Sequence, residues 1–139
     1  MSTAVAEKLS TYEVTALNSL IDEFVDEMLK SEGDEVINTM TDDIEMMPPD
    51  EPAATGKASV RKWLKDYPPI RRFELKLVHA EGHSELATGR GTFTITVHPR
   101  GGNQQTMKGK WIANYRKAPD GKWLCASQIW NYDAPVKTD

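Results

Sequence analysis

The spacing of apolar residues along the chain changes near residue 69. Before this point apolar residues recur every three or four positions, which is the period of one buried helix face. After it, apolar and polar residues alternate, as they do in half-buried strands. Helices followed by a run of antiparallel strands are typical of an α+β fold. The pattern therefore predicts three N-terminal helices packed on a curved antiparallel sheet.

Three helices are expected in the first half of the chain. The first begins at Ser10, which has capping-box spacing with Glu13, and it ends near residue 29, before Gly33. A short second helix follows, with Asp34 as its N-cap. The third opens at Gly56 and stops at the two prolines that follow Tyr67, because proline lacks the backbone N–H. The inward-facing residues of these helices are Val14, Leu17, Ile21, Phe24, Val25, Met28, Val36, Ile37, Met40, Val60, Trp63, Leu64 and Tyr67.

Strands are expected at 44–47, over about ten residues from 73, and at 84–98. In the 84–98 strand threonines occupy one face, and Phe93 and Ile95 share the other. The pattern does not decide which of these two faces lines the interior.

The stretch 107–135 has the pattern of a β-hairpin, with turn formers at 119–121 between two aromatic-rich arms. Because side chains alternate across a strand, each arm has one inward face. The residues expected to point inward are Trp111, Ala113 and Tyr115 on the first arm, and Leu124, Ala126, Gln128 and Trp130 on the second. The opposite face is also rather apolar, with Ile112, Trp123, Cys125 and Ile129.

Length and composition fit one domain spanning 1–139, with 1–9 as a loose arm. A net charge of -4 and the lack of a basic stretch argue against a nucleic-acid partner. Cys125 is the only cysteine, which excludes a disulfide within one chain. The sequence shows neither a membrane-span pattern nor a secretory signal, so a cytoplasmic protein without a membrane partner is expected.

A strongly curved sheet covered by helices leaves a hollow between the two layers. Polar atoms among large apolar side chains suit a hollow that holds a small organic ligand. The apolar outer face of the sheet also needs cover, and a second copy packed sheet to sheet would supply it. A homodimer through the outer sheet face is therefore predicted.

Several short motifs, in this order and spacing, are similar to those of one family. They are Thr41-Asp42-Asp43, Met47-Pro48-Pro49, Gly56-Lys57-Ala58, Gly89-Arg90-Gly91-Thr92-Phe93, Lys108-Gly109-Lys110-Trp111, Asp120-Gly121-Lys122-Trp123 and Trp130-Asn131-Tyr132-Asp133. From the first helix to Tyr132 the chain resembles the nuclear transport factor 2-like superfamily, specifically its SnoaL-like and ketosteroid-isomerase-like small proteins. The resemblance implies a cone-shaped α+β barrel, usually dimeric, with a pocket at the mouth of the cone.

This superfamily hosts enzymes as well as non-catalytic binding domains, so the resemblance does not settle the function. Ketosteroid isomerases use a general-base carboxylate, a tyrosine on the first helix and a protonated carboxylic acid on the penultimate strand. At the matching positions this chain has Pro48, Phe24 and Ala113. None of these side chains accepts or donates a proton, so the steroid-isomerase mechanism is not expected. Glu45 and Asp50 are the nearest carboxylates that could replace the base.

The resemblance also draws attention to Gln128, because SnoaL-like relatives often carry an acid at this position. Glutamine orients a carbonyl or hydroxyl group but does not act as an acid or base near neutral pH. Tyr115 is the candidate catalytic residue, since its hydroxyl would orient or protonate a carbonyl. The candidate ligand-binding residues are Trp63, Met46, Trp111, Gln128, Trp130 and Arg90. The alternative for Trp63 and Met46 is plain core packing, and for Tyr115 and Gln128 it is a hydrogen-bonded pair that fills the interior. Arg90 would otherwise pair at the surface or at an interface.

No cofactor is expected. His79, His83 and Glu81 surround a turn and suggest a metal site, but polar loop residues are the simpler interpretation, and no metal is predicted. Two functions stay open. One is a non-catalytic small-molecule-binding protein, and the other is an isomerase, cyclase or lyase acting on a small carbonyl-containing substrate.

Overall fold

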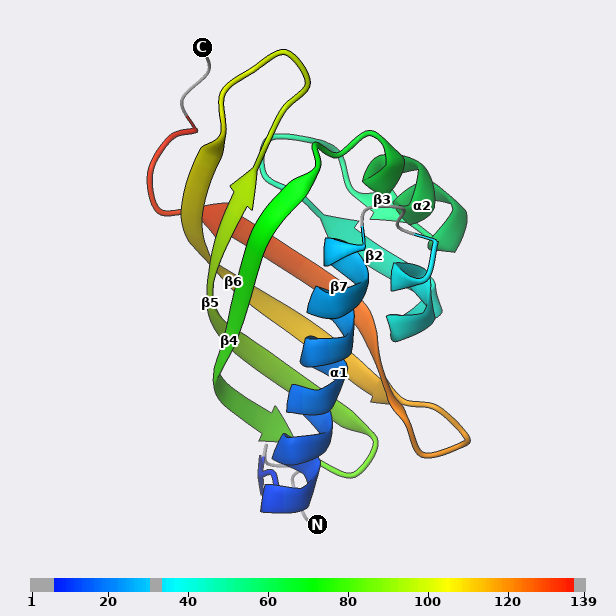
Figure 1. Ribbon diagram of the computed structural model, residues 1–139. Coiled ribbons are helices and arrows are strands. Elements are labelled where there is room, and N and C mark those ends of the chain that lie inside the picture. Colours follow the sequence, from blue (N-terminus) through cyan, green and yellow to red (C-terminus); the bar gives the residue numbers. More distant parts are fainter. Residues whose placement is uncertain (1–6, 31–33, 137–139) are drawn as a thin grey trace.

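The computed structural model describes residues 7–30 and 34–136. Seven strands of the described chain form one sheet in the order β1-β4-β5-β6-β7-β2-β3, and two α-helices and a short 3-10 helix accompany it (Figure 1). In chain order the elements are β1 (Glu7–Lys8), α1 (Thr11–Leu29), η1 (Val36–Thr39), β2 (Met40–Met47), β3 (Ala54–Thr55), α2 (Lys57–Lys65), β4 (Ile70–Gly82), β5 (Leu86–Val97), β6 (Gln105–Lys117) and β7 (Trp123–Tyr132).

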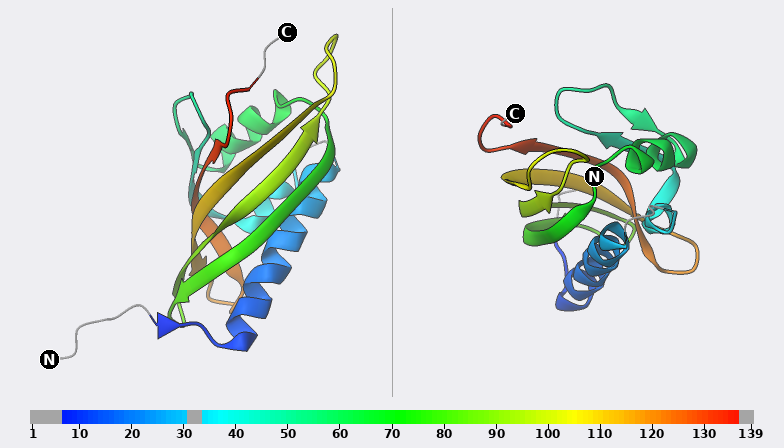
Figure 2. Two further views of the ribbon diagram at one scale, coloured as in Figure 1. Left: turned by 90° about the vertical axis from the view of Figure 1, so that its left-hand side faces the viewer. Right: turned by 45° about the horizontal axis from the view of Figure 1, so that its top comes forward.

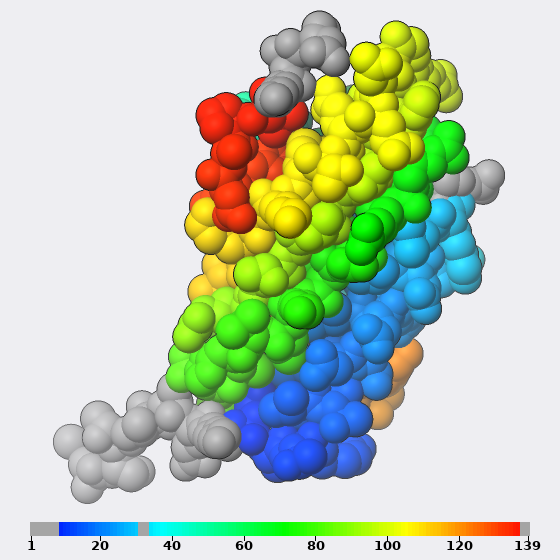
Figure 3. Space-filling view, turned by 60° about the vertical axis from the view of Figure 1, so that its left-hand side comes forward, coloured from blue at the N-terminus to red at the C-terminus, as the bar shows by residue number. Residues whose placement is uncertain are grey.

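The first helix forms where the sequence predicts it. The Ser10 hydroxyl caps it by accepting a hydrogen bond from the backbone N–H of Glu13 at 3.2 Å. Leu17, Leu20 and Ile21 are the buried residues of its apolar face. This face packs on the inner side of the sheet, and α1 lies alongside β4 (Figures 1 and 2). In the space-filling view the two elements lie against each other along their length, so the interior is covered on this side (Figure 3).

The expected second helix is a single 3-10 turn, so the described chain has two α-helices rather than three. Val36, Ile37 and Met40 are buried as expected, but Met40 already belongs to β2. Asp34 does not cap the turn. Its carboxylate pairs with Arg61 at 3.4 Å, and the residue at the cap position makes no side-chain cap. Gly33, expected to end the first helical unit, lies outside the described residues.

Most of the presumed N-terminal arm, 1–6, also lies outside the described residues. The end of that arm is not loose, because Glu7 and Lys8 pair with Gly82 and Glu81 of β4. Leu9 follows them and is buried in the main core. These contacts anchor the chain to the sheet just before α1 begins.

The sheet is strongly curved but open, because β1 lies at one edge and β3 at the other. The expected closed barrel therefore does not form among the described strands. The long strands curve around α1 although the sheet does not close, as the two views of Figure 2 show. The first and last parts of the chain meet through a parallel pair, in which Met46 of β2 lies opposite Gln128 of β7. This strand pair attaches the N-terminal half of the chain, which contains the helices, to the sheet.

A β-bulge in β7 changes which of its residues point inward. Asn114 of β6 pairs with Ser127, but Tyr115 pairs with Cys125, so Ala126 is an extra residue. Strict alternation from Gln128 and Trp130 would place Trp123 and Cys125 on the outer face. The bulge shifts the alternation by one, and these two side chains are 3% and 6% exposed. The predicted outer apolar face therefore loses Trp123 and Cys125 to the interior.

Candidate functional site: an apolar cavity between helices and sheet

The inner faces of β6 and β7 form a ladder of paired side chains that runs the length of the interior. Trp111 pairs with Trp130, Ala113 with Gln128, and Tyr115 with Cys125. Tyr132 precedes this series at one end, and the pair of Lys117 and Trp123 follows it at the other. Along this ladder the interior side chains change from aromatic rings at one end, through the Gln128 amide, to the Tyr115 phenol and the Cys125 thiol near the other end.

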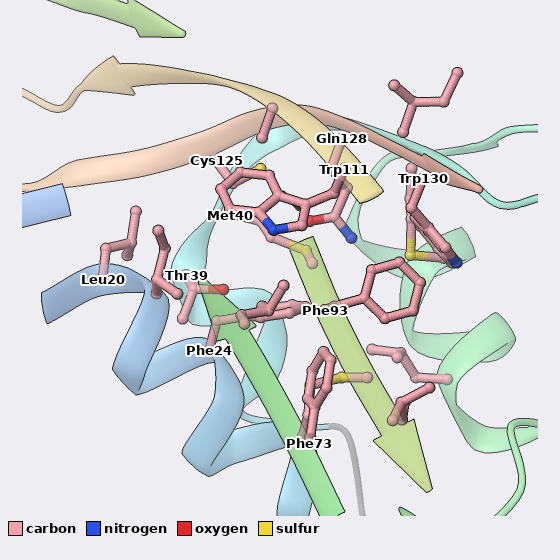
Figure 4. Close-up of a pocket in the computed structure, with 18 of the residues that line it drawn as sticks. Leu20, Phe24, Thr39, Met40, Phe73, Phe93, Trp111, Cys125, Gln128 and Trp130 are labelled. Carbon is pink, nitrogen blue, oxygen red and sulfur yellow. Dashed lines mark hydrogen bonds between the residues drawn. The ribbon is translucent and has the colours of Figure 1, made fainter. Parts of the chain in front are cut away.

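All of these side chains except Lys117 and Trp123 line a cavity of about 90 Å³ between the sheet and the helices. In the close-up, Trp111 and Gln128 reach in from the sheet, while Phe24 and Thr39 face them from the helical side (Figure 4). The described residues that line it are Leu20, Ile21, Phe24, Met28, Thr39, Met40, Met46, Trp63, Leu64, Tyr67, Phe73, Leu75, Phe93, Ile95, Trp111, Ala113, Tyr115, Cys125, Gln128, Ile129, Trp130 and Tyr132. None of them is Asp, Glu, His, Lys or Arg, so the wall carries no formal charge near neutral pH.

Two polar side chains of this wall, those of Tyr115 and Gln128, have hydrogen-bonding groups without a protein partner. The Tyr115 side chain is 4% exposed, and its hydroxyl has no hydrogen-bonding partner among the described residues. Because no fully buried side-chain oxygen of these residues lacks a partner, the hydroxyl is not fully enclosed. Gln128 accepts only a long contact of 3.7 Å from the Cys125 Sγ, and its amide N–H groups donate to none of the described residues. Thr39 differs, because its hydroxyl donates to the Val36 carbonyl at 2.6 Å. A ligand would therefore find free polar atoms at Tyr115 and Gln128.

Burial keeps the titratable groups of the cavity neutral. Loss of water contact raises the pKa of the Tyr115 phenol well above its ordinary value of 10, and the neighbouring Cys125 adds to this. The same cause raises the pKa of the Cys125 thiol to about 12. Neither group is a base near neutral pH. Each can donate a hydrogen bond, so this wall can orient a neutral acceptor but has no group suited to abstracting a proton.

One end of the cavity is built from interlocking aromatic rings. The Trp63 ring lies 5.0 Å from that of Tyr67 and 5.9 Å from that of Trp130, and Phe93 meets Tyr132 at 5.9 Å. The Trp63 indole donates a hydrogen bond of 3.1 Å to the Glu51 carboxylate. This bond ties the β2–β3 connection to the aromatic end.

The other end is closed by a charged cluster that follows the Tyr115–Cys125 pair. Glu13 accepts hydrogen bonds from Lys117 Nζ at 2.9 Å and from Trp123 Nε1 at 2.6 Å. The Lys117 ammonium also lies 5.0 Å from the centre of the Trp123 ring, a cation–π contact. Three long side chains thus join the first turn of α1 to the β6–β7 hairpin.

Glycines on β5 make room for the rings of β6. A Cβ at Gly91 would overlap the Lys76 carbonyl and lie 3.1 Å from the Trp111 ring. A Cβ at Gly89 would approach the Tyr115 ring to 3.2 Å. The Gly89-Arg90-Gly91 motif therefore accommodates these rings, and the nearby register shift falls on β4, between Leu77 and His79.

The structure brings most of the sequence-predicted site residues together. Trp63, Met46, Trp111, Gln128 and Trp130 all line the cavity, as does Tyr115. Arg90 does not. It is exposed on the outer face of β5, opposite Ile112, because Gly89 and Gly91 occupy the inward positions. The expectation of a pocket cation is therefore wrong.

Several residues that line the cavity were not predicted from the sequence. Phe93 and Ile95 line the cavity, so the aromatic face of the 84–98 strand points inward and the threonine face points outward. Cys125 was missed because nothing in the sequence marks the bulge at Ala126. Tyr132 continues the alternation of Gln128 and Trp130, and that signal could have identified it.

Two of the three positions aligned with ketosteroid isomerase residues do lie in the cavity wall. Phe24 and Ala113 line it and contribute only hydrocarbon surface, and Pro48 does not line it. The nearby carboxylates Glu45 and Asp50 also lie outside the wall. The missing proton-transfer groups are thus not replaced from these positions.

His79 and Glu81 lie 3.7 Å apart on β4, while His83 accepts a backbone hydrogen bond from Glu85. The described residues contain no group of three or more His, Cys, Asp or Glu side chains arranged to hold a metal ion. Nor does the described part of the chain include a helix with the length and apolar character needed to cross a membrane.

Comparison with known proteins identifies the family. The model of the SnoaL-like domain family matches residues 21–125. This match covers most of the chain, which therefore belongs to the SnoaL-like domain family within the nuclear transport factor 2-like superfamily. No curated protein matches the chain.

Solved structures share the fold at low sequence identity. A ketosteroid isomerase-like protein from Erwinia carotovora atroseptica is 20% identical, with a TM-score of 0.77 over 91% of this chain and 100% of its own. A conserved protein from Planctomyces limnophilus is 18% identical, with a TM-score of 0.78 over 88% and 99% of the two chains. A protein from Catenulispora acidiphila in complex with S-DNPA is 14% identical, with a TM-score of 0.76 over 89% and 96%.

Proposed function

We propose that this protein binds a largely apolar small molecule, whose part inside the inner cavity is uncharged, and does so without acid–base catalysis by its own side chains. The observation that carries the proposal is the mostly apolar cavity wall, in which the Tyr115 hydroxyl and the Gln128 amide N–H groups have no hydrogen-bonding partner among the described residues. No fully buried side-chain nitrogen or oxygen of the described residues lacks a partner, so these free polar atoms keep access to open space, where a ligand can reach them. The ligand would complete the hydrogen bonding.

The cavity wall also indicates what kind of ligand fits. Trp63, Trp111 and Trp130 offer flat apolar surfaces, and such surfaces suit an aromatic or other planar hydrocarbon skeleton. Tyr115 and Gln128 would donate to one or two oxygens of the ligand, as in a ketone or a quinone. A charged group inside the cavity would find no opposite charge in the wall, so the buried part of the ligand is uncharged.

Native mass spectrometry of the purified protein, followed by release and identification of any retained compound, tests this proposal. The expected result is a bound apolar compound with at least one carbonyl or hydroxyl oxygen. In Tyr115→Phe the compound should bind about 2- to 15-fold more weakly, which corresponds to one neutral hydrogen bond. Retention of a charged, strongly hydrophilic compound in the cavity would contradict the proposal.

The second candidate function is an isomerase, cyclase or lyase acting on a small carbonyl-containing substrate. The raised pKa of Tyr115 favours it in one respect, because a neutral phenol can stabilise an enolate oxygen by hydrogen bonding. The absence of a base from the described cavity wall opposes it. Under this alternative, Tyr115→Phe would abolish turnover of the identified compound while the fold stays intact. If the protein only binds the compound, neither wild type nor Tyr115→Phe should turn it over.

A homodimer through the outer sheet face belongs to the same proposal. Exposed hydrophobic residues remain on that face, although Trp123 and Cys125 are not among them. Ile112 and Ile129 are neighbours there, 45% and 44% exposed. Covering them with a second copy would bury apolar surface.

A further inference from the structure

A second hollow adjoins the aromatic end of the cavity. Its volume is about 400 Å³, and Met28, Leu64 and Tyr67 line both spaces. These three side chains therefore form the partition between them. Two of the three, Met28 and Leu64, are aliphatic and can change rotamer at small cost, and methionine is especially adaptable.

The second hollow lies at the end of the interior away from the Glu13 cluster. The strand β5 carries Phe93 and Ile95 on its inner face, and Pro99 and Arg100, which follow its end, line the second hollow. The opposite end of β5 pairs with the inner end of the ladder, where Ala87 lies opposite Tyr115. A molecule in the cavity would therefore extend toward Arg100, because the Glu13 cluster closes the other end.

The two spaces differ in charge. The cavity wall has no charged side chain, whereas the second hollow is lined by Lys65, Asp66 and Arg100. Lys65 and Arg100 are exposed, and neither forms an ion pair with a described residue. Lys65 lies in the last turn of α2, where a cation stabilises the helix dipole. That role does not account for Arg100, which lies in the β5–β6 turn.

We infer that the ligand is amphipathic, with an apolar part in the cavity and an anionic group in the second hollow beside Arg100 and Lys65. This inference rests on the proposed function. The two cations outnumber the one carboxylate of Asp66, and the guanidinium of Arg100 can bind a carboxylate through two hydrogen bonds. Met28, Leu64 and Tyr67 would contact the middle of the molecule, where it leaves the apolar space.

Competition against a neutral fluorescent dye tests the inference without a known ligand. N-phenyl-1-naphthylamine is larger than the cavity, so it would bind with its phenyl ring in the cavity and its naphthyl group in the second hollow. Unbranched ω-phenylalkanoates from phenylacetate to phenyloctanoate would displace it. The primary amide of each acid is its uncharged control. We expect the carboxylate and the amide to compete equally when the chain is too short to pass the partition. In the longer compounds the carboxylate should bind more tightly.

Charge variants locate the effect. Arg100→Gln and Lys65→Gln should each reduce the affinity of the longer carboxylates about two- to fivefold, as expected for solvent-exposed ion pairs, and leave the amides unchanged. Asp66→Asn should strengthen carboxylate binding. Arg90→Gln is the matched control, because it removes the same charge from the outer face of the sheet.

The outcomes separate this inference from the proposed function. If the dye binds but carboxylates and amides compete equally at every length, or if Arg90→Gln weakens carboxylates as much as Arg100→Gln does, the anionic subsite is wrong and the cavity proposal stands. If the dye does not bind and no compound in the series binds in direct calorimetry, both proposals fail.

Discussion

Glu13 and Trp123 lie 110 positions apart in the sequence, and a hydrogen bond of 2.6 Å joins the indole Nε1 to the Glu13 Oε2. Sequence spacing predicted that Glu13 would serve the helix cap together with Ser10. Ser10 does cap the helix, but the Glu13 carboxylate binds Lys117 and Trp123 instead. A residue expected to act locally therefore closes one end of the interior by connecting α1 to the β6–β7 hairpin.

This cluster should make stability depend on pH in acid. The hydrogen bond from Lys117, supported by the bond from Trp123 and by the Lys117 charge, holds the pKa of Glu13 below its ordinary value of 4.5. The folded state therefore binds fewer protons here than the unfolded state does. This contribution is complete above the ordinary pKa and is lost as the pH falls through the lowered value.

The measurement is the free energy of unfolding of Glu13→Gln and wild type across this pH range. At neutral pH the variant should be less stable by about 1–2 kcal/mol, and the difference should shrink at acidic pH. Asp22→Asn, exposed on the same helix, is the control and should change stability by less than about 0.5 kcal/mol. A Glu13→Gln deficit that stays constant with pH would show that the carboxylate charge is not what stabilises the cluster.

Tyr115→Phe should leave the free energy of unfolding unchanged or raise it by up to about 1 kcal/mol. The hydroxyl has no hydrogen-bonding partner among the described residues and is not fully enclosed, so its removal breaks no hydrogen bond within the described protein. Denaturant unfolding of the ligand-free protein measures this. A loss of 2 kcal/mol or more, expected only if the hydroxyl were part of a structural network, would contradict a ligand-directed role.

Cys125 should react slowly with disulfide reagents in the folded protein. The reactive form is the thiolate, and burial raises the pKa of this thiol to about 12, so little thiolate exists near neutral pH. Reaction of the native protein should speed up on addition of denaturant, and a ligand in the cavity should slow it further. Fast labelling of the native protein at neutral pH would place the thiol outside the cavity wall.

Gly91→Ala should destabilise the protein by about 1–3 kcal/mol, because the added methyl group would press on the Lys76 carbonyl and the Trp111 ring. Gly102→Ala is the matched control. A Cβ there would come no closer than 3.4 Å to Pro99, an ordinary contact in an exposed turn. Thermal or denaturant unfolding compares the two variants, and equal stabilities would mean that Gly91 does not make room for the ring.

Local patterns in the sequence were enough to predict α1, the β6–β7 hairpin and the inward position of five of the six candidate ligand-binding residues. These depend on periodicity, which is a property of neighbouring residues. The inward position of Cys125 could not be predicted, because one extra residue at Ala126 reverses the alternation and leaves no compositional mark. The outward position of Arg90 could not be predicted either, because it depends on the neighbouring strand. Gly89 and Gly91 occupy the inward positions, where the lack of side chains leaves room for the rings of Tyr115 and Trp111.

Equilibrium binding of benzene to wild type and to Ala113→Phe, measured by calorimetry, tests the cavity proposal most directly. Ala113 is buried opposite Gln128, and its methyl group faces the cavity, so a phenyl ring at this position would fill it. Saturable binding of one benzene per chain is expected in wild type, and its loss is expected in an Ala113→Phe variant whose circular dichroism spectrum is unchanged. Equal binding to both proteins, or none to wild type, would contradict a ligand cavity between the helices and the sheet.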